Sequence, residues 1–351
     1  MENQNKIFAL VDINNCYVSC ERVFNPSLNN KPVIVLSNND GCAVARSQEV
    51  KDLGIKMGVP FFQLKDLVEQ HNITVLSSNY ALYAEMSRRF IKVLAEFVTP
   101  QEQEIYSIDE CFLDLTAYAS NYDLTAYAHL ILDRLTRWLG LPACIGIGRT
   151  KTEAKLANHI AKKNSYLKGV CNLVSMDYCS IEGLYQSIEV SEVWGIGRKH
   201  TKKLNSLSVN TVLDFVCSSP LIIRDQFSIV MHRTLLELQG ISCIEIEQSP
   251  KAKKQIIASR SFGQKVYSRE DLKEAITLYV QDAVSRLRSE NLLCGCIISF
   301  VQSNPFDSSE RFYNKSLSYA LPDPSDNSLL LSKIGTKSNI NTKRVNAQLR
   351  L

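Results

Sequence analysis

The sequence predicts an α+β protein made of several domains. Its 351 residues are enough for two to four domains that each bury a core. Apolar residues make up 45% of the chain and charged residues 22%, a globular composition that excludes a disordered, collagen-like or disulfide-stapled protein. Strand-like and helical patterns alternate up to about residue 164, and short helical patterns then follow up to about residue 240, which indicates a change of domain.

Short apolar runs closed by turn residues predict the strands of the first half, and apolar residues spaced three or four apart predict its helices. The opening run ends at Asp12, and the run that follows it ends in the turn-rich sequence SNNDGC. In chain order we expect strands over 6–11 and 31–36, helical patches over 46–70, a helix over 80–97, a strand over 104–115, a helix over 127–139, a strand over 143–147 and a helix over 152–163.

The second half contains short helices separated by glycine-rich and serine-rich turns, followed by a charged segment over 248–255 that includes Pro250 and is typical of a linker. No helical periodicity and no strand are expected in the last sixteen residues, TKSNINTKRVNAQLRL. Beyond the linker we expect a strand over 255–262, a helix over 269–289, strands over 294–302 and 312–321, and the beginning of a helix over 324–334.

Charge and cysteine usage narrow the class of protein without naming a partner. The net charge of +4 is compatible with a nucleic-acid partner and does not require one. Eleven cysteines with no paired CxxC spacing predict reduced, mostly buried thiols rather than a zinc site. No apolar run approaches the 18 residues of a membrane span, so we expect a cytoplasmic protein without a membrane partner.

Three carboxylates occur where apolar strands are predicted. Asp12 directly follows the first strand, and Asp109 and Glu110 lie inside the strand over 104–115. Burying an unpaired carboxylate is costly, so such acids indicate a bound cation, although each taken alone also fits an ordinary strand end. Oxygen ligands without a neighbouring His or Cys favour Mg²⁺ over zinc, and three acids brought together would bind two such ions. Adjacent residues on a flat strand face opposite sides, so Asp109 and Glu110 converge only if the strand bends.

Seven motifs spread over most of the chain carry a resemblance to a known family. They are VDINNCYVSCE (11–21), KPVIVLSNNDGC (31–42), EVKDLGIKMGVP (49–60), SSNYALY (77–83), YSIDECFLDL (106–115), GIGRTKTEAKLANHIAKK (146–163) and VWGIGRKHTKKL (193–204). Together they resemble the Y-family of translesion DNA polymerases, most closely its bacterial UmuC branch, over about residues 6–330.

The resemblance implies a right-hand polymerase, with a helical thumb that contains a helix-hairpin-helix and a little finger of β-α-β-β-α type that lacks its last strand. The implied divisions are a palm over 1–17 and 78–165, fingers over 18–77, a thumb over 166–243, a linker over 244–254, an incomplete little finger over 255–332 and a divergent basic tail over 333–351.

The family pattern also assigns roles around the carboxylates. It implies that Asp12, Asp109 and Glu110 bind the metals together with the Ile13 carbonyl. Tyr17 stands where the family keeps an aromatic steric gate, which leaves no space for a ribose 2′-OH; taken alone it also fits a core aromatic residue. The preceding residue is a cysteine, whereas relatives usually have an aromatic ring there, and this puts the shape of the sugar pocket in doubt.

Basic residues of two motifs are implied to hold the nucleotide triphosphate. Lys51 and Lys155 match the family's basic residues, and Arg46 lies in the same segment as Lys51. Three lysines and a histidine recur at helical spacing over 151–162 and form one cationic face, which fits a phosphate partner or simple solvation. GIGRTKT lacks the spacing of a P-loop. The members of this face are Lys151, Lys155, His159 and Lys162, of which His159 is expected to be structural.

Two further segments are candidates for contact with the DNA backbone. The turn Trp194–Arg198 precedes lysines at 199, 202 and 203 and resembles a helix-hairpin-helix, whose glycines let backbone amides approach phosphates. A glycine turn between packed helices is the alternative. In SRSFG (259–263), Arg260 matches the first strand of the little finger. The candidate DNA-binding residues are Gly195, Gly197, Arg198, Lys202 and Arg260.

The implied reaction is template-directed addition of deoxynucleotides to a primer 3′-OH with two Mg²⁺ ions, in the SOS response to DNA damage. The implied partners are primer–template DNA, deoxynucleoside triphosphates and a processed UmuD-like dimer; the sliding clamp is doubtful, because its binding motif is absent. The missing strand predicts a truncated chain with a frameshift near 333–335. The alternatives are therefore a DNA-binding or interfering protein with weak catalysis and, more remotely, a nuclease that uses the same metals.

Overall fold

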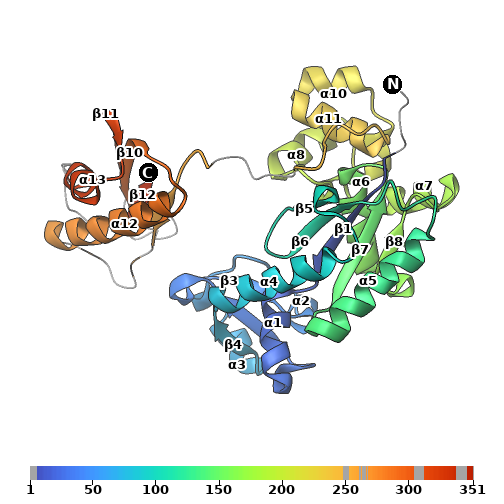
Figure 1. Ribbon diagram of the computed structural model, residues 1–351, viewed down its shortest axis with the longest axis horizontal. Helices are drawn as coiled ribbons and strands as arrows, with labels where there is room; N and C mark the ends of the chain where they lie inside the picture. Colours follow the sequence, from blue (N-terminus) through green and yellow to red (C-terminus); the bar gives the residue numbers. More distant parts are fainter. Residues whose placement is uncertain are drawn as a thin grey trace. The chain divides into compact units, whose positions relative to one another are not determined.

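The computed structural model describes residues 6–247, 253–260, 262, 266, 268–303 and 312–336, and the backbone of 346–350. The chain divides into two compact units, Met1–Pro250 and Lys251–Leu351 (Figure 1). No described helix is both long and apolar enough to cross a membrane. Each unit contains its own sheet and its own apolar core, which confirms the α+β class predicted from the sequence.

A five-stranded sheet forms the centre of the first unit, in the order β5-β6-β1-β7-β8. The middle strand β1 is antiparallel to both of its neighbours, and its last residues pair Asp12 with Glu110 across the β1–β6 ladder. The strands are β1 (Phe8–Ile13), β5 (Gln103–Ile105), β6 (Glu110–Asp114), β7 (Ala143–Gly148) and β8 (Val170–Asn172).

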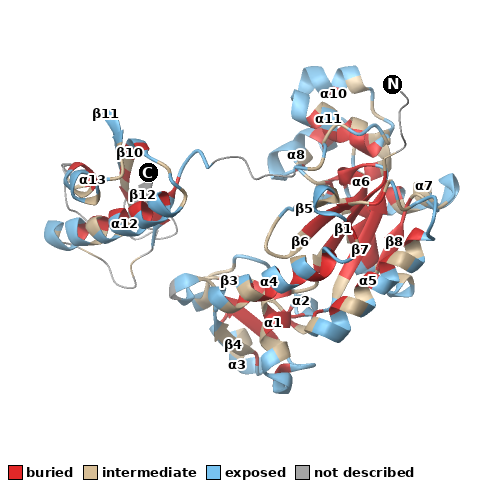
Figure 2. Ribbon diagram, in the orientation of Figure 1, coloured by how far each residue is buried: buried red, intermediate tan, exposed pale blue. Residues whose placement is uncertain are grey.

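Alternate residues of β1 point to two differently covered faces of this sheet. Ala9, Val11 and Ile13 pack against helices α4 (Tyr80–Leu94) and α5 (Leu124–Leu139) in the largest core cluster. The intervening residues Phe8 and Leu10 pack with Ala154 of helix α6 (Lys151–Lys163) on the other face. Figure 2 shows the strands of the sheet buried between these helices, so the alternation in β1 fixes which face receives α6.

Glycines of β7 allow α6 to approach the sheet closely. A Cβ atom at Gly146 would lie 2.0 Å from the backbone nitrogen of Asn158, and one at Gly148 would lie 2.5 Å from the Cβ of Glu153. The Asn158 amide also donates hydrogen bonds to the carbonyls of Leu10 (3.3 Å) and Cys144 (2.7 Å). The GIG sequence therefore serves close packing of a helix on a strand.

The single strand expected over 104–115 is interrupted. Residues 106–109 form a turn between β5 and β6, in which the backbone amides of Tyr106 and Ser107 both donate to the Glu110 carbonyl at 3.1 Å. This turn supplies the bend that neighbouring carboxylates require in order to lie on one side of the sheet.

A smaller sheet and its helices form a subregion with a separate apolar cluster around Ile34, Leu36 and Val50. Its strands run in the order β3-β2-β4. The elements are β2 (Val33–Leu36), β3 (Ala43–Arg46), α2 (Gln48–Asp52), α3 (Lys65–Gln70) and β4 (Thr74–Ser77). Helix α1 (Cys16–Phe24) precedes them in the chain, and its buried apolar residues belong to the largest core cluster.

Five short helices follow the larger sheet and share one cluster with the outer side of α6. They are α7 (Tyr178–Ser187), α8 (Arg198–Ser206), α9 (Val212–Val216), α10 (Pro220–Gln226) and α11 (Ile229–Leu238). The extended segment 243–247 then returns to the sheet. The backbone amides of Cys243 and Ile244 donate to the buried Glu237 carboxylate, and the buried Lys151 ammonium donates to the Glu245 carbonyl. The first residues of the expected linker are thus held by backbone contacts.

The second unit has the order β-α-β-β-α-β. Its sheet runs β11-β10-β12-β9, and β12 pairs antiparallel with both β10 and β9. The prediction that the closing strand is missing is therefore wrong. That strand is short, and the alternation of Ala347 and Leu349 with polar residues was too brief to predict it. The elements are β9 (Ile257–Ser259), α12 (Arg269–Ser289), β10 (Cys294–Gln302), β11 (Asn314–Ser325), α13 (Ser328–Gly335) and β12 (Asn346–Arg350).

Gly335 ends α13 where the helix meets β10. A Cβ atom there would lie 3.3 Å from Ile297 Cδ1 and 3.4 Å from Ser299 Oγ, and the Ser299 hydroxyl donates to the Gly335 carbonyl at 3.1 Å. The glycine that suggested an interrupted helix is instead a close contact between helix and sheet.

Candidate active site

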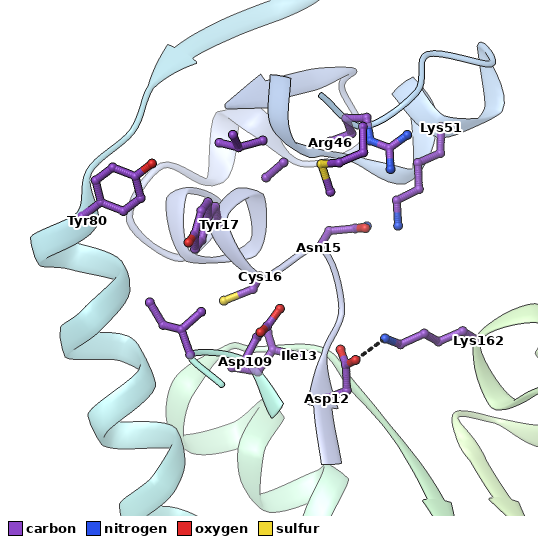
Figure 3. A pocket seen from close by; sticks show the side chains of 14 residues that line it. Asp12, Ile13, Asn15, Cys16, Tyr17, Arg46, Lys51, Tyr80, Asp109 and Lys162 are labelled. Carbon is purple, nitrogen blue, oxygen red and sulfur yellow. Dashed lines mark ion pairs between the residues drawn. The ribbon is translucent and has the colours of Figure 1, made fainter. Parts of the chain in front are cut away.

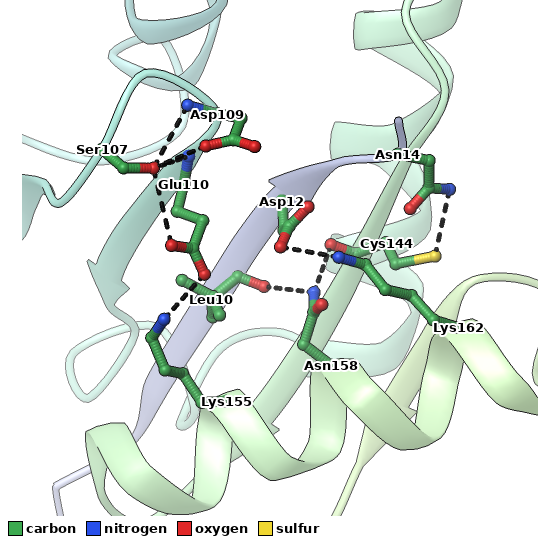
Figure 4. Close-up of polar contacts among 10 residues, drawn as sticks. All are labelled: Leu10, Asp12, Asn14, Ser107, Asp109, Glu110, Cys144, Lys155, Asn158 and Lys162. Carbon is green, nitrogen blue, oxygen red and sulfur yellow. Dashed lines mark hydrogen bonds and ion pairs between the residues drawn. The ribbon is translucent and has the colours of Figure 1, made fainter. Parts of the chain in front are cut away.

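The three candidate carboxylates lie at one end of the paired strands β1 and β6 in the larger sheet (Figure 4). Asp12 and Glu110 face each other in the β1–β6 register, and the amide of Ile13 donates to the Asp109 carbonyl at 2.9 Å. The strand end and the turn after β5 thus place acids that are almost a hundred residues apart in the sequence at the same end of the β1–β6 pair.

Ser107 holds the two acids of the turn. Its hydroxyl oxygen lies 2.7 Å from Asp109 Oδ1 and 3.5 Å from Glu110 Oε2, and it accepts hydrogen bonds from the backbone amides of both residues. A single side chain therefore orients both carboxylates relative to the backbone of the turn.

Each of two carboxylates is paired with a lysine of α6. Lys162 Nζ lies 2.6 Å from Asp12 Oδ2, and Lys155 Nζ lies 2.7 Å from Glu110 Oε1. Burial raises the pKa of Asp12 to about 6, although Lys162 acts to lower it, and the neighbouring Glu110 and Asp109 raise it further. The site is thus short of positive charge even with its lysines in place.

The chemistry of these donors fits a hard divalent cation. Carboxylate oxygens and a backbone carbonyl are the ligands that Mg²⁺ prefers. Burial, which raises the pKa of Asp12, disfavours its negative charge unless a cation compensates it. Within the described part of the chain, no three His, Cys, Asp or Glu side chains already converge on one point. Binding a cation would therefore require the carboxylates to come closer together than they lie here.

A cavity of about 410 Å³ lies between the carboxylates and the smaller sheet (Figure 3). Its acidic side contains Asp12 and Asp109, and its opposite side contains cationic side chains. The residues lining it are Asp12, Ile13, Asn15, Cys16, Tyr17, Val44, Ala45, Arg46, Lys51, Met57, Tyr80, Ile108, Asp109 and Lys162.

Among the described residues, three cations face this cavity: Arg46 from β3, Lys51 from α2 and Lys162 from α6. The pKa of Lys51 is lowered by burial and by the charges of Arg46 and Lys162. Arg46 donates to the Ile55 carbonyl at 2.5 Å, while its buried Nε has no hydrogen-bond partner in the described ranges. Like charges held together in this way are suited to a multiply charged anion.

Aromatic rings form the wall of the cavity beside the carboxylates. The Tyr17 ring stacks on Tyr83 with centroids 4.2 Å apart and meets Tyr80 edge to face at 6.0 Å. Cys16 lines the same wall and is almost fully buried, with a hydrogen bond to Cys20 that, together with burial, raises the pKa of its thiol far above the usual range. The cysteine leaves the wall smaller than an aromatic residue would.

The predicted site residues do not all meet at this cavity. Lys155 pairs with Glu110 and is not among the residues that line the cavity. The candidate DNA-binding residues of the first unit are all exposed: Gly195 (φ +87°), Gly197 at the N-cap of α8, Arg198 and Lys202. Arg260 is also exposed but belongs to the second unit. His159 is partly buried, lies 3.5 Å from Glu192 and does not line this cavity.

Sequence reasoning missed several residues of the site. Lys162 was placed only on a cationic helix face, yet it lines the cavity and pairs with Asp12. The sequence did contain a signal: Lys162 follows Lys155 by seven residues, about two helical turns, so both side chains lie on the same face of the helix. Ser107 and Tyr83 carried no signal of their own, because their roles depend on the turn and on the packing of α1 against α4.

Two family models match most of the chain. The impB/mucB/samB family matches residues 11–159, and the C-terminal domain of the same family matches residues 253–338. Protein UmuC of Salmonella typhimurium is 43% identical over 323 residues, 92% of this chain and 76% of the relative. Protein ImpB of the same species is 42% identical over 322 residues with the same coverage, and MucB of Escherichia coli is 41% identical over 300 residues, 86% of this chain and 70% of the relative.

Solved structures show the same fold at low sequence identity. A Y-family DNA polymerase chimera of Dbh and Dpo4 superposes with a TM-score of 0.76 and 18% identity, covering 98% of this chain and 97% of the other. An insertion ternary complex of Dbh DNA polymerase gives a TM-score of 0.60 and 17% identity over 98% and 97% of the two chains.

Proposed function

Because the chain belongs to the impB/mucB/samB family of UmuC-like Y-family proteins, we propose that it is a translesion DNA polymerase that adds deoxynucleotides to a primer 3′-OH on a DNA template. One observation carries the proposal. A cavity has Asp12, Asp109 and Lys162 on one side, Arg46 and Lys51 on the opposite side, and tyrosine rings in its wall (Figure 3). In this arrangement the carboxylates suit the reacting phosphate with its metals, the cations suit the triphosphate, and the tyrosine rings suit the sugar of a nucleotide.

Asp12, Asp109, Glu110 and the Ile13 carbonyl are the groups proposed to hold two Mg²⁺ ions. When bound, the ions lower the pKa of the attacking hydroxyl and neutralise charge on the leaving phosphate oxygens. The protein's part is to fix the ligands: Ser107 orients Asp109 and Glu110, and the β1–β6 register fixes Asp12 opposite them.

Arg46, Lys51 and Lys162 are proposed to hold the triphosphate. They come from three different elements and converge on one cavity, so an anion of several charges interacts with all of them together. Burial lowers the pKa of Lys51, and the charges of Arg46 and Lys162 lower it further; this repulsion is relieved when that anion binds. Held in this way, the α-phosphate stays close to the carboxylates.

Tyr17 is proposed to select deoxyribose. Its ring is fixed by the Tyr83 stack, and the cavity wall therefore has little freedom to yield to a 2′-OH. The small Cys16 beside it gives the sugar more room than an aromatic residue would, so we expect selection to depend chiefly on Tyr17.

The remaining assignments follow the family pattern. We propose the palm, fingers, thumb and little finger over the ranges that this pattern implies, with the little finger extended to β12. The glycine turn before α8 and Arg260 are proposed to contact the DNA backbone without reading sequence. An SOS role, a processed UmuD-like dimer as partner and a cytoplasmic location belong to the same proposal.

Primer extension by the purified full chain tests the function. We expect Mg²⁺-dependent synthesis on an undamaged template and on one with an abasic site, and Asp109→Ala should abolish it while primer–template binding stays within about threefold. DNA binding without synthesis by the unsubstituted chain would favour the interfering protein instead, and degradation of the primer would favour a nuclease.

A further inference from the structure

Lys155 contacts two aromatic rings in addition to its ion-pair partner Glu110. Its side chain is 16% exposed. The ammonium lies 4.4 Å from the centroid of the Tyr106 ring and 5.2 Å from that of Trp194, in addition to 2.7 Å from Glu110 Oε1. The cation is therefore held by a carboxylate and by the faces of two aromatic rings.

The two rings belong to a cluster that is itself fixed by the sheet. Tyr106 and Trp194 meet edge to face at 5.6 Å, and both contact Phe112 of β6, at 5.6 Å and 6.3 Å. Phe112 is fully buried. Trp194 is consequently anchored against the strand that begins with Glu110, although it follows that strand by some eighty residues.

These contacts argue against a direct role for Lys155 in holding phosphate. Its charge is directed at Glu110 and at two rings, whereas Arg46, Lys51 and Lys162 line the cavity. A lysine with three such neighbours has little freedom to swing towards a ligand in the cavity, which it does not line.

We propose that Trp194 is a positioning residue: together with Tyr106 it forms an aromatic cage that presses the Lys155 ammonium against Glu110 and so sets the position of this carboxylate. The inference rests on the proposed function, because it assumes that Glu110 binds a catalytic metal. It replaces triphosphate binding as the role of Lys155.

The cage also connects the glycine turn that is proposed to contact DNA with the proposed metal ligand Glu110. Trp194 immediately precedes Gly195, whose φ of +87° turns the chain towards Gly197 and the start of α8. A DNA phosphate held at this turn is therefore two contacts away from Glu110, through Trp194 and Lys155.

The decisive variant is Trp194→Leu, compared with Trp194→Phe, which keeps a ring. Trp138→Leu is the matched control, because Trp138 also stacks on a cation, with Arg134 Cζ 4.4 Å from its ring, but lies on α5 outside the cavity lining. Mn²⁺ affinity is measured by electron paramagnetic resonance titration of the full chain with a dideoxy-terminated primer–template and a matching deoxynucleotide, so that no turnover is needed.

Trp194→Leu is expected to weaken Mn²⁺ binding and to lower kcat by about 3- to 30-fold each, the range that loss of a partly desolvated cation–π contact allows. The KM for the deoxynucleotide should change by less than about threefold, because the cavity cations are untouched. Trp194→Phe and Trp138→Leu should resemble the unsubstituted chain. Wild-type Mn²⁺ affinity in Trp194→Leu would overturn the proposal.

A double-mutant cycle separates positioning from general packing. If Trp194 acts through Lys155, Trp194→Leu combined with Lys155→Met binds Mn²⁺ no more weakly than Lys155→Met alone. If the two losses multiply, Trp194 only stabilises the fold and the proposal fails.

Fluorescence provides a readout that needs neither activity nor a substitution at Trp194. The chain has two tryptophans, so Trp138→Phe leaves Trp194 as the only emitter. Adding Lys155→Met should shift its emission, and Lys155→Arg should preserve it; an unchanged spectrum in Lys155→Met contradicts the cage. An unsubstituted chain that extends no primer would refute the polymerase proposal, while this shift would still report whether the cage exists.

Discussion

The rings of Tyr17 and Tyr83 lie almost parallel, 12° apart, with their centroids separated by 4.2 Å. Tyr83 is fully buried on α4, and its hydroxyl donates to Glu21 Oε1 at 2.7 Å. The cavity wall formed by Tyr17 is thus supported from behind by a ring that cannot move without disturbing α1 and α4.

This stack predicts that Tyr83 controls sugar selection indirectly. Tyr83→Leu leaves Tyr17 unsupported and should raise the ratio of ribonucleotide to deoxynucleotide incorporation by about 10-fold, because a flexible ring excludes the 2′-OH less well. Single-nucleotide incorporation kinetics measure the ratio. Tyr83→Phe is the matched control: it keeps the stack, and the ratio should stay near that of the unsubstituted chain. An unchanged ratio in Tyr83→Leu would show that Tyr17 needs no support.

Lys162 should contribute more to nucleotide binding than the adjacent Lys163. Lys162→Met removes a cation that lines the cavity and pairs with Asp12, and we expect the KM for the deoxynucleotide to rise by about 10-fold or more. Steady-state primer extension measures it. Lys163→Met is the control, because Lys163 is exposed and does not line this cavity. Equal effects of the two substitutions would indicate only a general loss of positive charge.

The buried ion pair of Lys151 and Glu104 should contribute to stability rather than to catalysis. Lys151 is 1% exposed, and it also donates to the Glu245 carbonyl at 2.6 Å. Lys151→Met leaves a buried carboxylate without its cation and should cost about 3–5 kcal/mol of the free energy of unfolding, measured by urea denaturation. Lys6→Met removes an exposed partner of Glu245 and should cost less than about 1 kcal/mol. Comparable losses would show that the pair is not effectively buried.

Glu153 predicts a pH dependence of stability. Burial raises the pKa of this carboxyl from 4.5 to about 7, against the opposing hydrogen bond from the Arg149 backbone amide. Between these values the folded state binds more protons than the unfolded state, so stability falls as the pH rises from 4.5 to 7 and then levels off.

Glu153→Gln should therefore stabilise the protein by up to about 3 kcal/mol at pH 8, and by less than about 1 kcal/mol at pH 5. Urea denaturation at the two pH values measures the difference. Glu69→Gln, at an exposed position of α3, serves as the control and should show no such trend. A gain at pH 5 equal to that at pH 8 would contradict the raised pKa.

Local sequence patterns predicted most elements of the fold because their signals span several residues. The helix over 269–289 and the strand over 294–302 occur with the predicted bounds, since each has a long periodic or apolar run. The strand β12 escaped prediction because a five-residue strand is stabilised by its neighbours β9 and β10 rather than by its own composition. The turn at 106–109 escaped for a related reason: it is closed by Ser107 and by backbone bonds to Glu110.

The amino-acid sequence shows which strand residues carry charge, and its seven motifs are enough to identify the family. It also placed Asp12 at a strand end and Arg46 and Lys51 in one segment. Which lysine pairs with which acid depends on tertiary packing. Lys155 and Lys162 lie on the same helix at the same helical phase, and their neighbours depend on how α6 seats against Gly146 and Gly148 of β7. Long-range packing, which has no local signature, separates the cation of the nucleotide cavity from the cation of the aromatic cage.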